Sequence, residues 1–327
     1  MPSAPPRRRP TVLAALAAAG ALVLATGACA SSTDGAATAP EAIVTSFYPI
    51  QFATQQITAG AVPVSVLTKP GAEPHDLELS PQDIAGMTKA RLVVYADGFQ
   101  PAVDEAVGLV DPAKVLDVAD AAKLVPATEG DHGGEPAGSG GSGGSAGHDG
   151  HDHAGDDPHF WLDPSRYAAV AEAIGARLAK DDPTHAKTYA RNTAVFVEKL
   201  SQLDDELRVG LSQCRIKQLV TSHAAFGYLA DRYGFRQQGI TGVSPDNEPS
   251  AAALRTVADL VKSSGVTTIY QETLVEPQFA DTVAGSTGAK VATLDPIEGI
   301  TSASVGRDYF EVMRSNLVAL RAGQGCS

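Results

Sequence analysis

The sequence predicts an α/β protein with two lobes, each built on a parallel sheet, joined by a long helix. In both halves of the chain, short apolar segments rich in β-branched residues alternate with helical segments. This alternation is typical of parallel sheets with right-handed crossovers. Between the halves, residues 184–211 place apolar side chains on one helical face, which predicts a rigid helix about 40 Å long at about 1.5 Å per residue.

The first half contains four candidate strands, at residues 43–47, 62–67, 92–95 and 115–118. A helix is expected at 49–59, and Ser80-Pro81 starts another, because Ser caps free N–H groups and Pro suits the first helical position. A further helix at 164–180 ends at Asp181-Asp182-Pro183. We therefore predict a first lobe over residues 42–182 and a linking helix over 183–211.

The second half repeats the alternation and predicts a second lobe over residues 212–327. Its candidate strands are residues 216–221, 235–240, 267–270 and 291–294, and its candidate helices are 224–233, 249–264, 277–287 and 304–322. Each half is about four βα units long. Two such lobes form a cleft, and ligands of such folds bind at the carboxyl ends of the strands.

The N-terminus has the features of a secretion signal. Three arginines at positions 7–9 precede an apolar run over 12–25 and then Thr26-Gly27-Ala28-Cys29, which resembles a lipobox. We expect residues 1–28 to be removed, Cys29 to carry lipid, and residues 29–41 to be a flexible tether to the outer face of a bacterial cell membrane. The alternative is plain secretion with cleavage near Ala30.

The net charge and the cysteine content limit the classes of function and the cellular compartment that the chain fits. The net charge is −13, and losing the three arginines of residues 1–28, which contain no acid, makes it −16. Such an acidic surface argues against nucleic acid and suits a cation. Outside the cytoplasm, Cys214 and Cys326 are expected to pair in a disulfide. The alternative for them is a two-thiolate metal site.

A Gly-, Ser-, Asp- and His-rich tract over residues 128–157 interrupts the first lobe. It has no Lys or Arg and cannot bury a core, so we expect it to be disordered without metal. Its histidines predict an auxiliary loop that binds zinc weakly, although they could also be an accident of composition. They are His132, His148, His151 and His153.

Four further residues are candidate ligands of one metal, two from each lobe. His75 follows the second strand, His159 follows the tract, His223 lies where a strand passes into a helix, and Asp295 ends another strand. Three imidazoles and one carboxylate suit tetrahedral Zn²⁺, whereas Mn²⁺ prefers more oxygen ligands and is the less expected cargo. Glu272, at a further strand end, is expected to support a ligand from behind.

The motifs around these residues resemble the zinc/manganese solute-binding proteins of ABC transporters, over residues 42–324. They are Glu73-Pro74-His75-Asp76, Asp157-Pro158-His159-Phe160-Trp161-Leu162-Asp163-Pro164, Ser222-His223-Ala224-Ala225-Phe226-Gly227-Tyr228 and Leu294-Asp295-Pro296. The resemblance implies two (β/α)₄ lobes with one metal between them, bound by His75, His159, His223 and Asp295. It also implies zinc uptake with a permease and its ATPase as partners; we expect a monomer.

An enzyme is not expected. A catalytic zinc keeps one position open for water, whereas four protein ligands close the site, and the chain has no His-Glu-x-x-His motif. Three alternatives stay open. One is a manganese- or iron-binding member of the same family, another is an adhesin or metal-buffering lipoprotein without a transporter, and the third is a zinc hydrolase with three protein ligands and a bound water.

Overall fold

The computed structural model describes residues 41–127, 155–245, 248–274 and 277–327. The signal segment, Cys29 and the tether up to residue 40 lie outside these ranges. The same is true of the histidines of the tract, His132, His148, His151 and His153. The predictions made for all of these residues therefore lie outside the described structure. Among the described residues, no helix is both long and apolar enough to cross a bilayer.

The first sheet has four parallel strands in the order β2-β1-β3-β4. The strands are β1 (Ile43–Thr45), β2 (Val64–Val66), β3 (Leu92–Tyr95) and β4 (Val115–Asp117). The helices of this half are α1 (Tyr48–Thr58), α2 (Pro81–Lys89), α3 (Pro101–Val107) and α4 (Ala119–Ala122). Ser80 caps α2 as expected, since its hydroxyl accepts from Asp83 N at 3.2 Å. The short helices α3 and α4 were not predicted from the sequence.

The second sheet repeats this arrangement with the strand order β6-β5-β7-β8, again all parallel. Its strands are β5 (Gln218–Thr221), β6 (Arg236–Gly239), β7 (Thr268–Gln271) and β8 (Lys290–Thr293), and its helices are α7 (Gly227–Tyr233), α8 (Ala251–Ser264), α9 (Gln278–Thr287) and α10 (Tyr309–Gln324). Helix α10 starts later than expected, because Asp308 caps it by accepting from Glu311 N at 3.0 Å. The predicted α/β fold with two parallel four-stranded sheets is confirmed.

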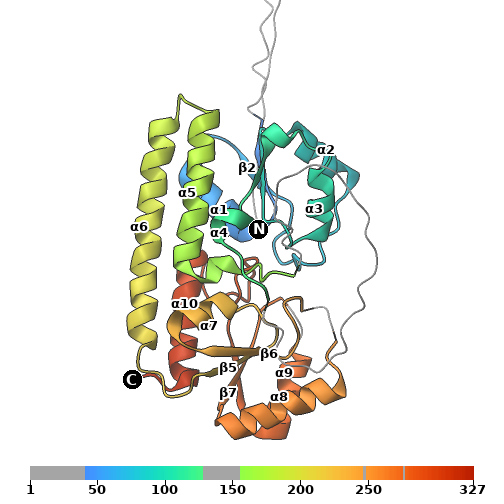
Figure 1. The fold of residues 1–327 in the computed structure, drawn as a ribbon, viewed down its shortest axis with the longest axis vertical. Coiled ribbons are helices and arrows are strands. Elements are labelled where there is room, and N and C mark those ends of the chain that lie inside the picture. The colour runs from blue at the N-terminus through green and yellow to red at the C-terminus, as the bar shows by residue number, and fades with distance from the viewer. Residues whose placement is uncertain (1–40, 128–154, 246–247, 275–276) are drawn as a thin grey trace, which may run out of the picture. The chain divides into compact units, whose positions relative to one another are not determined.

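Two long helices lie side by side between the sheet-forming halves of the sequence, α5 (Pro164–Asp181) and α6 (Ala186–Leu211) (Figure 1). Their axes approach closely at Gly175, where a Cβ would lie 2.1 Å from Thr193 Oγ1, so only glycine fits. Helix α6 buries one apolar face with a spacing of three to four residues. That face consists of Tyr189, Phe196, Leu200, Leu203, Leu207 and Leu211.

One apolar core contains residues from both halves of the chain and includes a cluster of buried aromatic rings. Buried hydroxyls in it donate to backbone carbonyls, Tyr167 Oη to Pro49 O and Tyr309 Oη to Trp161 O, both at 2.6 Å. Just after the C-terminal end of α6, Cys214 forms with Cys326 the disulfide expected from the sequence. This bond ties the chain end after α10 to the segment after α6.

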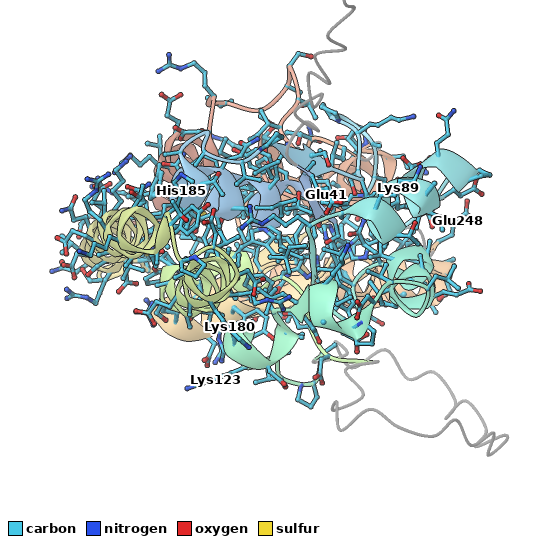
Figure 2. The ribbon with its side chains drawn as sticks, turned by 90° about the horizontal axis from the view of Figure 1, so that it is seen from above. Glu41, Lys89, Lys123, Lys180, His185 and Glu248 are labelled. Carbon is cyan, nitrogen blue, oxygen red and sulfur yellow. A yellow bond between two sulfur atoms is a disulfide. The ribbon has the colours of Figure 1, made fainter. Side chains whose placement is uncertain are left out.

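Many polar and charged side chains lie on the outside of the described body, as Figure 2 shows for six labelled residues. All six are exposed: Glu41, Lys89, Lys123, Lys180, His185 and Glu248. His185 precedes α6, and its Nδ1 lies 2.8 Å from Asp182 Oδ2. It is therefore a surface histidine, unlike the histidines described next, of which His159 and His223 are buried and His75 is half-buried.

Candidate metal centre

His75 lies in the loop after β2, and neighbouring side chains fix that loop. Gln100, fully buried at the start of α3, donates its Nε2 to Pro74 O at 3.0 Å and to Thr68 Oγ1 at 2.9 Å. The His75 amide donates to Glu73 Oε1 at 3.1 Å, and the imidazole packs edge-on against the Phe99 ring. These contacts leave the His75 ring pointing toward the other histidines, 5.4 Å from His159 and 6.1 Å from His223 between ring centroids.

His159 immediately precedes the 3₁₀ turn Phe160–Leu162 and is completely buried. One carboxylate oxygen fixes it, because Asp157 Oδ1 accepts from the His159 amide at 3.0 Å and lies 2.8 Å from the ring Nδ1. With Nδ1 held by Asp157, the other ring nitrogen, Nε2, faces Glu298 Oε1 at 3.2 Å. Asp157 belongs to the motif noticed in the sequence, but its role in orienting His159 was missed.

His223 follows β5, at the carboxyl end of the strand, and is also buried. Its Nδ1 lies 2.7 Å from Oε1 of Glu272, which follows β7, and Ser222 Oγ donates to the same oxygen at 2.8 Å. His223 Nε2 then faces Glu298 Oε1 at 3.2 Å. Glu272 thus lies behind His223, on the side of the ring away from the other histidines, which is the place of a supporting carboxylate.

Glu298, rather than Asp295, completes the group of candidate ligands. Ligand atoms of His75, His159, His223 and Glu298 all lie within 4.8 Å of one another. Asp295, the fourth ligand expected from the sequence, is not a member of this group, because its carboxylate contacts its own loop and the segment after β7 instead. There Asp295 Oδ1 accepts from Ile297 N at 2.8 Å and Oδ2 accepts from Thr273 Oγ1 at 3.4 Å. The sequence did contain a signal for Glu298, because it is the second acid in the segment Asp295-Pro296-Ile297-Glu298.

The buried carboxylates change the protonation of this group. Burial disfavours charge on His223, but the negative charges and hydrogen bonds of Glu272 and Glu298 outweigh it and raise its pKa well above the usual value. The pKa of His159 is raised in the same way, since Asp157 and Glu298 outweigh burial. Burial lowers the pKa of His75. Burial would raise the pKa of Glu298, yet hydrogen bonds from the imidazoles hold it well below the ordinary value.

The donor set suits a bound cation. Three imidazoles and a carboxylate form a typical zinc-binding set, and the back nitrogens of His159 and His223 each face a carboxylate. Two buried atoms of the group, His75 Nε2 and Glu298 Oε2, have no hydrogen-bond partner among the described residues. Unpaired buried polar atoms are costly, so these two are suited to contact an ion. The group fits one divalent metal ion.

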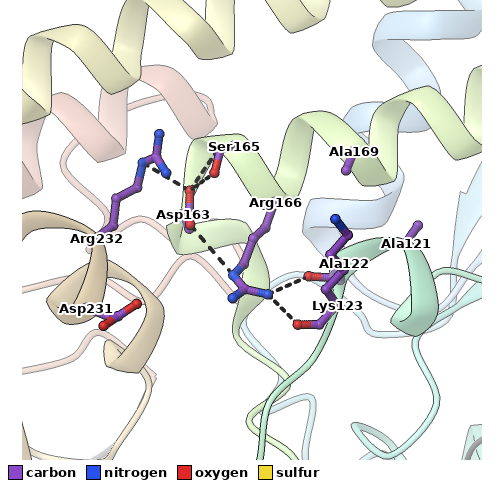
Figure 3. Close-up of a pocket in the computed structure, with 9 residues that line it drawn as sticks. All are labelled: Ala121, Ala122, Lys123, Asp163, Ser165, Arg166, Ala169, Asp231 and Arg232. Atoms are coloured by element: carbon purple, nitrogen blue, oxygen red, sulfur yellow. Dashed lines mark hydrogen bonds and ion pairs between the residues drawn. The ribbon is translucent and has the colours of Figure 1, made fainter.

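A pocket of about 340 Å³ lies elsewhere, between α4, α5 and α7 (Figure 3). Its two arginines already have partners. Arg166 donates Nη1 to Ala122 O at 2.8 Å and lies over the Tyr228 ring, and Arg232 Nε lies 3.3 Å from Asp163 Oδ1 and 2.5 Å from Asp204 Oδ1. These contacts tie α7 to the start of α5 and to α6. The pocket contains no histidine and is not the metal centre.

The two sheets, the paired helices and the buried His₃Glu group define a solute-binding protein with a metal site. Residues 43–323 match the family described as zinc-uptake complex component A, periplasmic. The chain belongs to this family, which confirms the resemblance noted in the sequence. The family is that of a component of an uptake complex and not of an enzyme.

Curated relatives agree with this assignment. The chain is 39% identical over 284 residues to the zinc-binding protein AdcA of Streptococcus pyogenes, which covers 85% of this chain and 55% of the relative. It is 36% identical over 316 residues to the high-affinity zinc uptake system protein ZnuA of Bacillus subtilis, covering 92% and 94%. The chain thus spans about half the length of the AdcA relatives but nearly all of the ZnuA relative.

Solved structures with the same fold include two streptococcal proteins. The Zn(II)-bound ZnuA-like domain of Streptococcus pneumoniae AdcA superimposes with a TM-score of 0.69 at 33% identity, covering 87% of this chain and 99% of that one. The laminin-binding protein Lmb of Streptococcus agalactiae, described as bifunctional with adhesin and metal-transporting activity, has a TM-score of 0.72 at 31% identity and the same coverage.

Proposed function

We propose that this protein binds Zn²⁺ outside the cytoplasm and delivers it to an ABC permease, which works with its ATPase. The observation that carries the proposal is the convergence of three imidazole nitrogens on one buried oxygen, Glu298 Oε1, from four separate loops. In the proposed site, His75, His159, His223 and Glu298 bind the ion. Asp157 and Glu272 hold two of the imidazoles in place.

The chemistry of the ligands favours zinc over manganese. Three nitrogens and one carboxylate suit a four-coordinate zinc ion, whereas manganese prefers a set richer in oxygen. Closing the site with four protein ligands also suits transport, because it leaves no open position for catalysis by a bound water. The curated relatives named for zinc support the same choice.

A metal titration tests this function. Mature protein prepared without metal should bind one Zn²⁺ tightly, and Mn²⁺ should not displace it at comparable concentration. His223→Ala should abolish the tight stoichiometric binding. Asn192→Ala, a change on α6 away from the histidines, serves as the matched control. Tighter binding of Mn²⁺, or wild-type affinity in His223→Ala, contradicts the proposal.

We also propose that the mature protein is a monomer tethered by lipid on Cys29 to the outer face of the cell membrane. The lipobox-like sequence supports this, as does a relative from Streptococcus pneumoniae, 36% identical over 282 residues, that is named a zinc-binding lipoprotein. Cys29→Ala should release the protein from the membrane fraction into the medium. Continued membrane association of that variant would refute the anchor.

The second candidate function is adhesion, which the likeness to the laminin-binding protein of Streptococcus agalactiae favours. Immobilised laminin provides the test. Saturable binding of the mature protein to laminin supports this second function, and no binding above an albumin control removes it.

A further inference from the structure

The loop that presents Glu298 contains a backbone conformation that its sequence does not favour. Ile297, directly before Glu298, has a φ of 60° and is completely buried. A β-branched residue rarely adopts this left-handed conformation, and it persists only where the surrounding structure imposes it. The conformation therefore depends on contacts from outside Ile297, and three neighbouring residues supply them.

Asp295 makes the first contact from within the loop. Its Oδ1 accepts from Ile297 N at 2.8 Å, across Pro296. Asn316, on α10 and 2% exposed, makes a pair of contacts with the backbone of Asp295. Asp295 N donates to Asn316 Oδ1 at 3.0 Å, and Asn316 Nδ2 donates to Asp295 O at 2.7 Å. The start of the loop is thereby fastened to a helix.

Trp161 makes the third contact and connects this loop to the segment of His159. Its Nε1 donates to Pro296 O at 2.7 Å. Trp161 lies two residues after His159, and its own carbonyl accepts from Tyr309 Oη at 2.6 Å. Both sides of the His159–Glu298 pair are thus fastened to α10, the His159 side at Tyr309, its first residue, and the Glu298 side at Asn316.

We propose that Asp295, Asn316 and Trp161 are positioning residues for Glu298. They hold the strained turn that points the Glu298 carboxylate at the three imidazoles, so the site is arranged for a small four-coordinate ion before the ion arrives. The inference rests on the proposed zinc function and goes beyond it, since none of the three residues belongs to the proposed ligand set. Without them the turn relaxes, and Glu298 loses its fixed direction.

Paired substitutions at Asp295 separate positioning from direct metal binding. Asp295→Ala removes the acceptor for Ile297 N and should weaken Zn²⁺ binding about 10- to 100-fold, the usual loss when a partner of a metal ligand is removed. Asp295→Asn keeps an oxygen at that place and should restore most of the affinity. If Asp295 were itself a ligand, Asn would be almost as damaging as Ala. Equal, large losses in both variants overturn the inference.

Asn316→Ala and Trp161→Phe test the other two contacts, and the second removes the Nε1 donor but keeps a buried ring. Each should weaken Zn²⁺ binding and also change the visible absorption of the Co²⁺-loaded protein, which reports the geometry of the ligands. The matched control is Asn192→Ala, because it likewise removes an amide side chain that bonds to backbone, Asn192 Nδ2 on α6 donating to Ile57 O on α1 at 2.9 Å. The control should change neither affinity nor spectrum.

A double-mutant cycle shows whether these residues act through Glu298. In a Glu298→Ala background, Asn316→Ala should have no further effect on Zn²⁺ affinity, and an undiminished further loss would overturn the inference. If Asn316→Ala does not fold, the same cycle is made with Trp161→Phe. Failure of the proposed function is distinguishable, because then the wild-type protein itself does not bind Zn²⁺ tightly. If the wild-type protein binds Zn²⁺ tightly and Asp295→Ala, Asn316→Ala and Trp161→Phe all bind it equally tightly, only the positioning role is refuted.

Discussion

Glu298 Oε1 lies 3.2 Å from Nε2 of His159, a residue 139 positions earlier in the chain, and equally far from Nε2 of His223. One buried carboxylate oxygen is therefore the common neighbour of two imidazoles, with Nε2 of the third, His75, at 3.7 Å. Hydrogen bonds from His159 and His223 keep the Glu298 pKa well below its usual value despite burial. A carboxylate that stays charged inside the protein is well suited to bind a cation.

Replacing this carboxylate should weaken the site strongly. In Glu298→Gln, the neutral amide is a poorer ligand and carries no charge. Zn²⁺ affinity should therefore fall by more than ~100-fold, which is the largest loss usual when a residue that only supports a metal ligand is replaced. Competition with a chelating dye measures this loss. Asn192→Ala is the control, since Asn192 Nδ2 donates to Ile57 O and contacts none of the proposed ligands in the described structure. Unchanged affinity in Glu298→Gln would exclude Glu298 as a ligand.

Glu272→Gln should have a smaller effect than loss of a ligand. The amide can still accept a hydrogen bond from His223 Nδ1, but it no longer supplies the negative charge that makes the imidazole a stronger donor to the metal. We expect a loss of about 10- to 100-fold in Zn²⁺ affinity, with the stoichiometry of one retained. Isothermal titration measures both quantities. Complete loss of the tight site would mean that Glu272 itself binds the ion.

Zinc binding should strengthen with rising pH. The pKa values of His159 and His223 are raised in the fold, so protonation of these two rings stabilises the metal-free protein. This stabilisation is complete below about pH 6.5, the ordinary pKa of histidine, and is lost as the pH rises through the raised pKa values. Zinc must displace those protons, so its affinity should rise up to about tenfold per pH unit for each proton released. Titrations at pH 6 to 9, in buffers with different ionisation heats, count the protons. Flat affinity with no proton release contradicts this.

Deleting the His-rich tract should separate tight from weak binding. Removal of residues 131–156 takes away His132, His148, His151 and His153 but leaves the four proposed ligands in place. The shortened protein should keep one tight Zn²⁺ and bind less zinc in total, because mixed His/Asp sites without fixed geometry bind more weakly. Elemental analysis after dialysis against graded zinc concentrations measures this. Equal totals in both proteins would refute the auxiliary loop.

Local patterns in the sequence were enough to predict most of the fold. Strand positions such as 92–95 were predicted as found, because short β-branched runs and helix caps are local signals. The three histidines were also predictable, since each lies in a distinctive motif near the carboxyl end of a strand or before a helix. Their assembly at one point follows from the parallel topology, in which strand ends share one edge of a sheet.

Tertiary structure decided which acid completes the group and which residues hold it. Asp295 and Glu298 are both acids of the same loop, and only the left-handed turn at Ile297, imposed by Asn316 on α10 and by Trp161, turns Asp295 inward and directs Glu298 to the histidines. Those contacts join residues far apart in the chain, so no local pattern reports them. The sequence by itself thus determined the fold class, the three histidines and the expectation of zinc. The choice of Glu298 came from packing, because the direction of a side chain depends on backbone conformation set by distant neighbours.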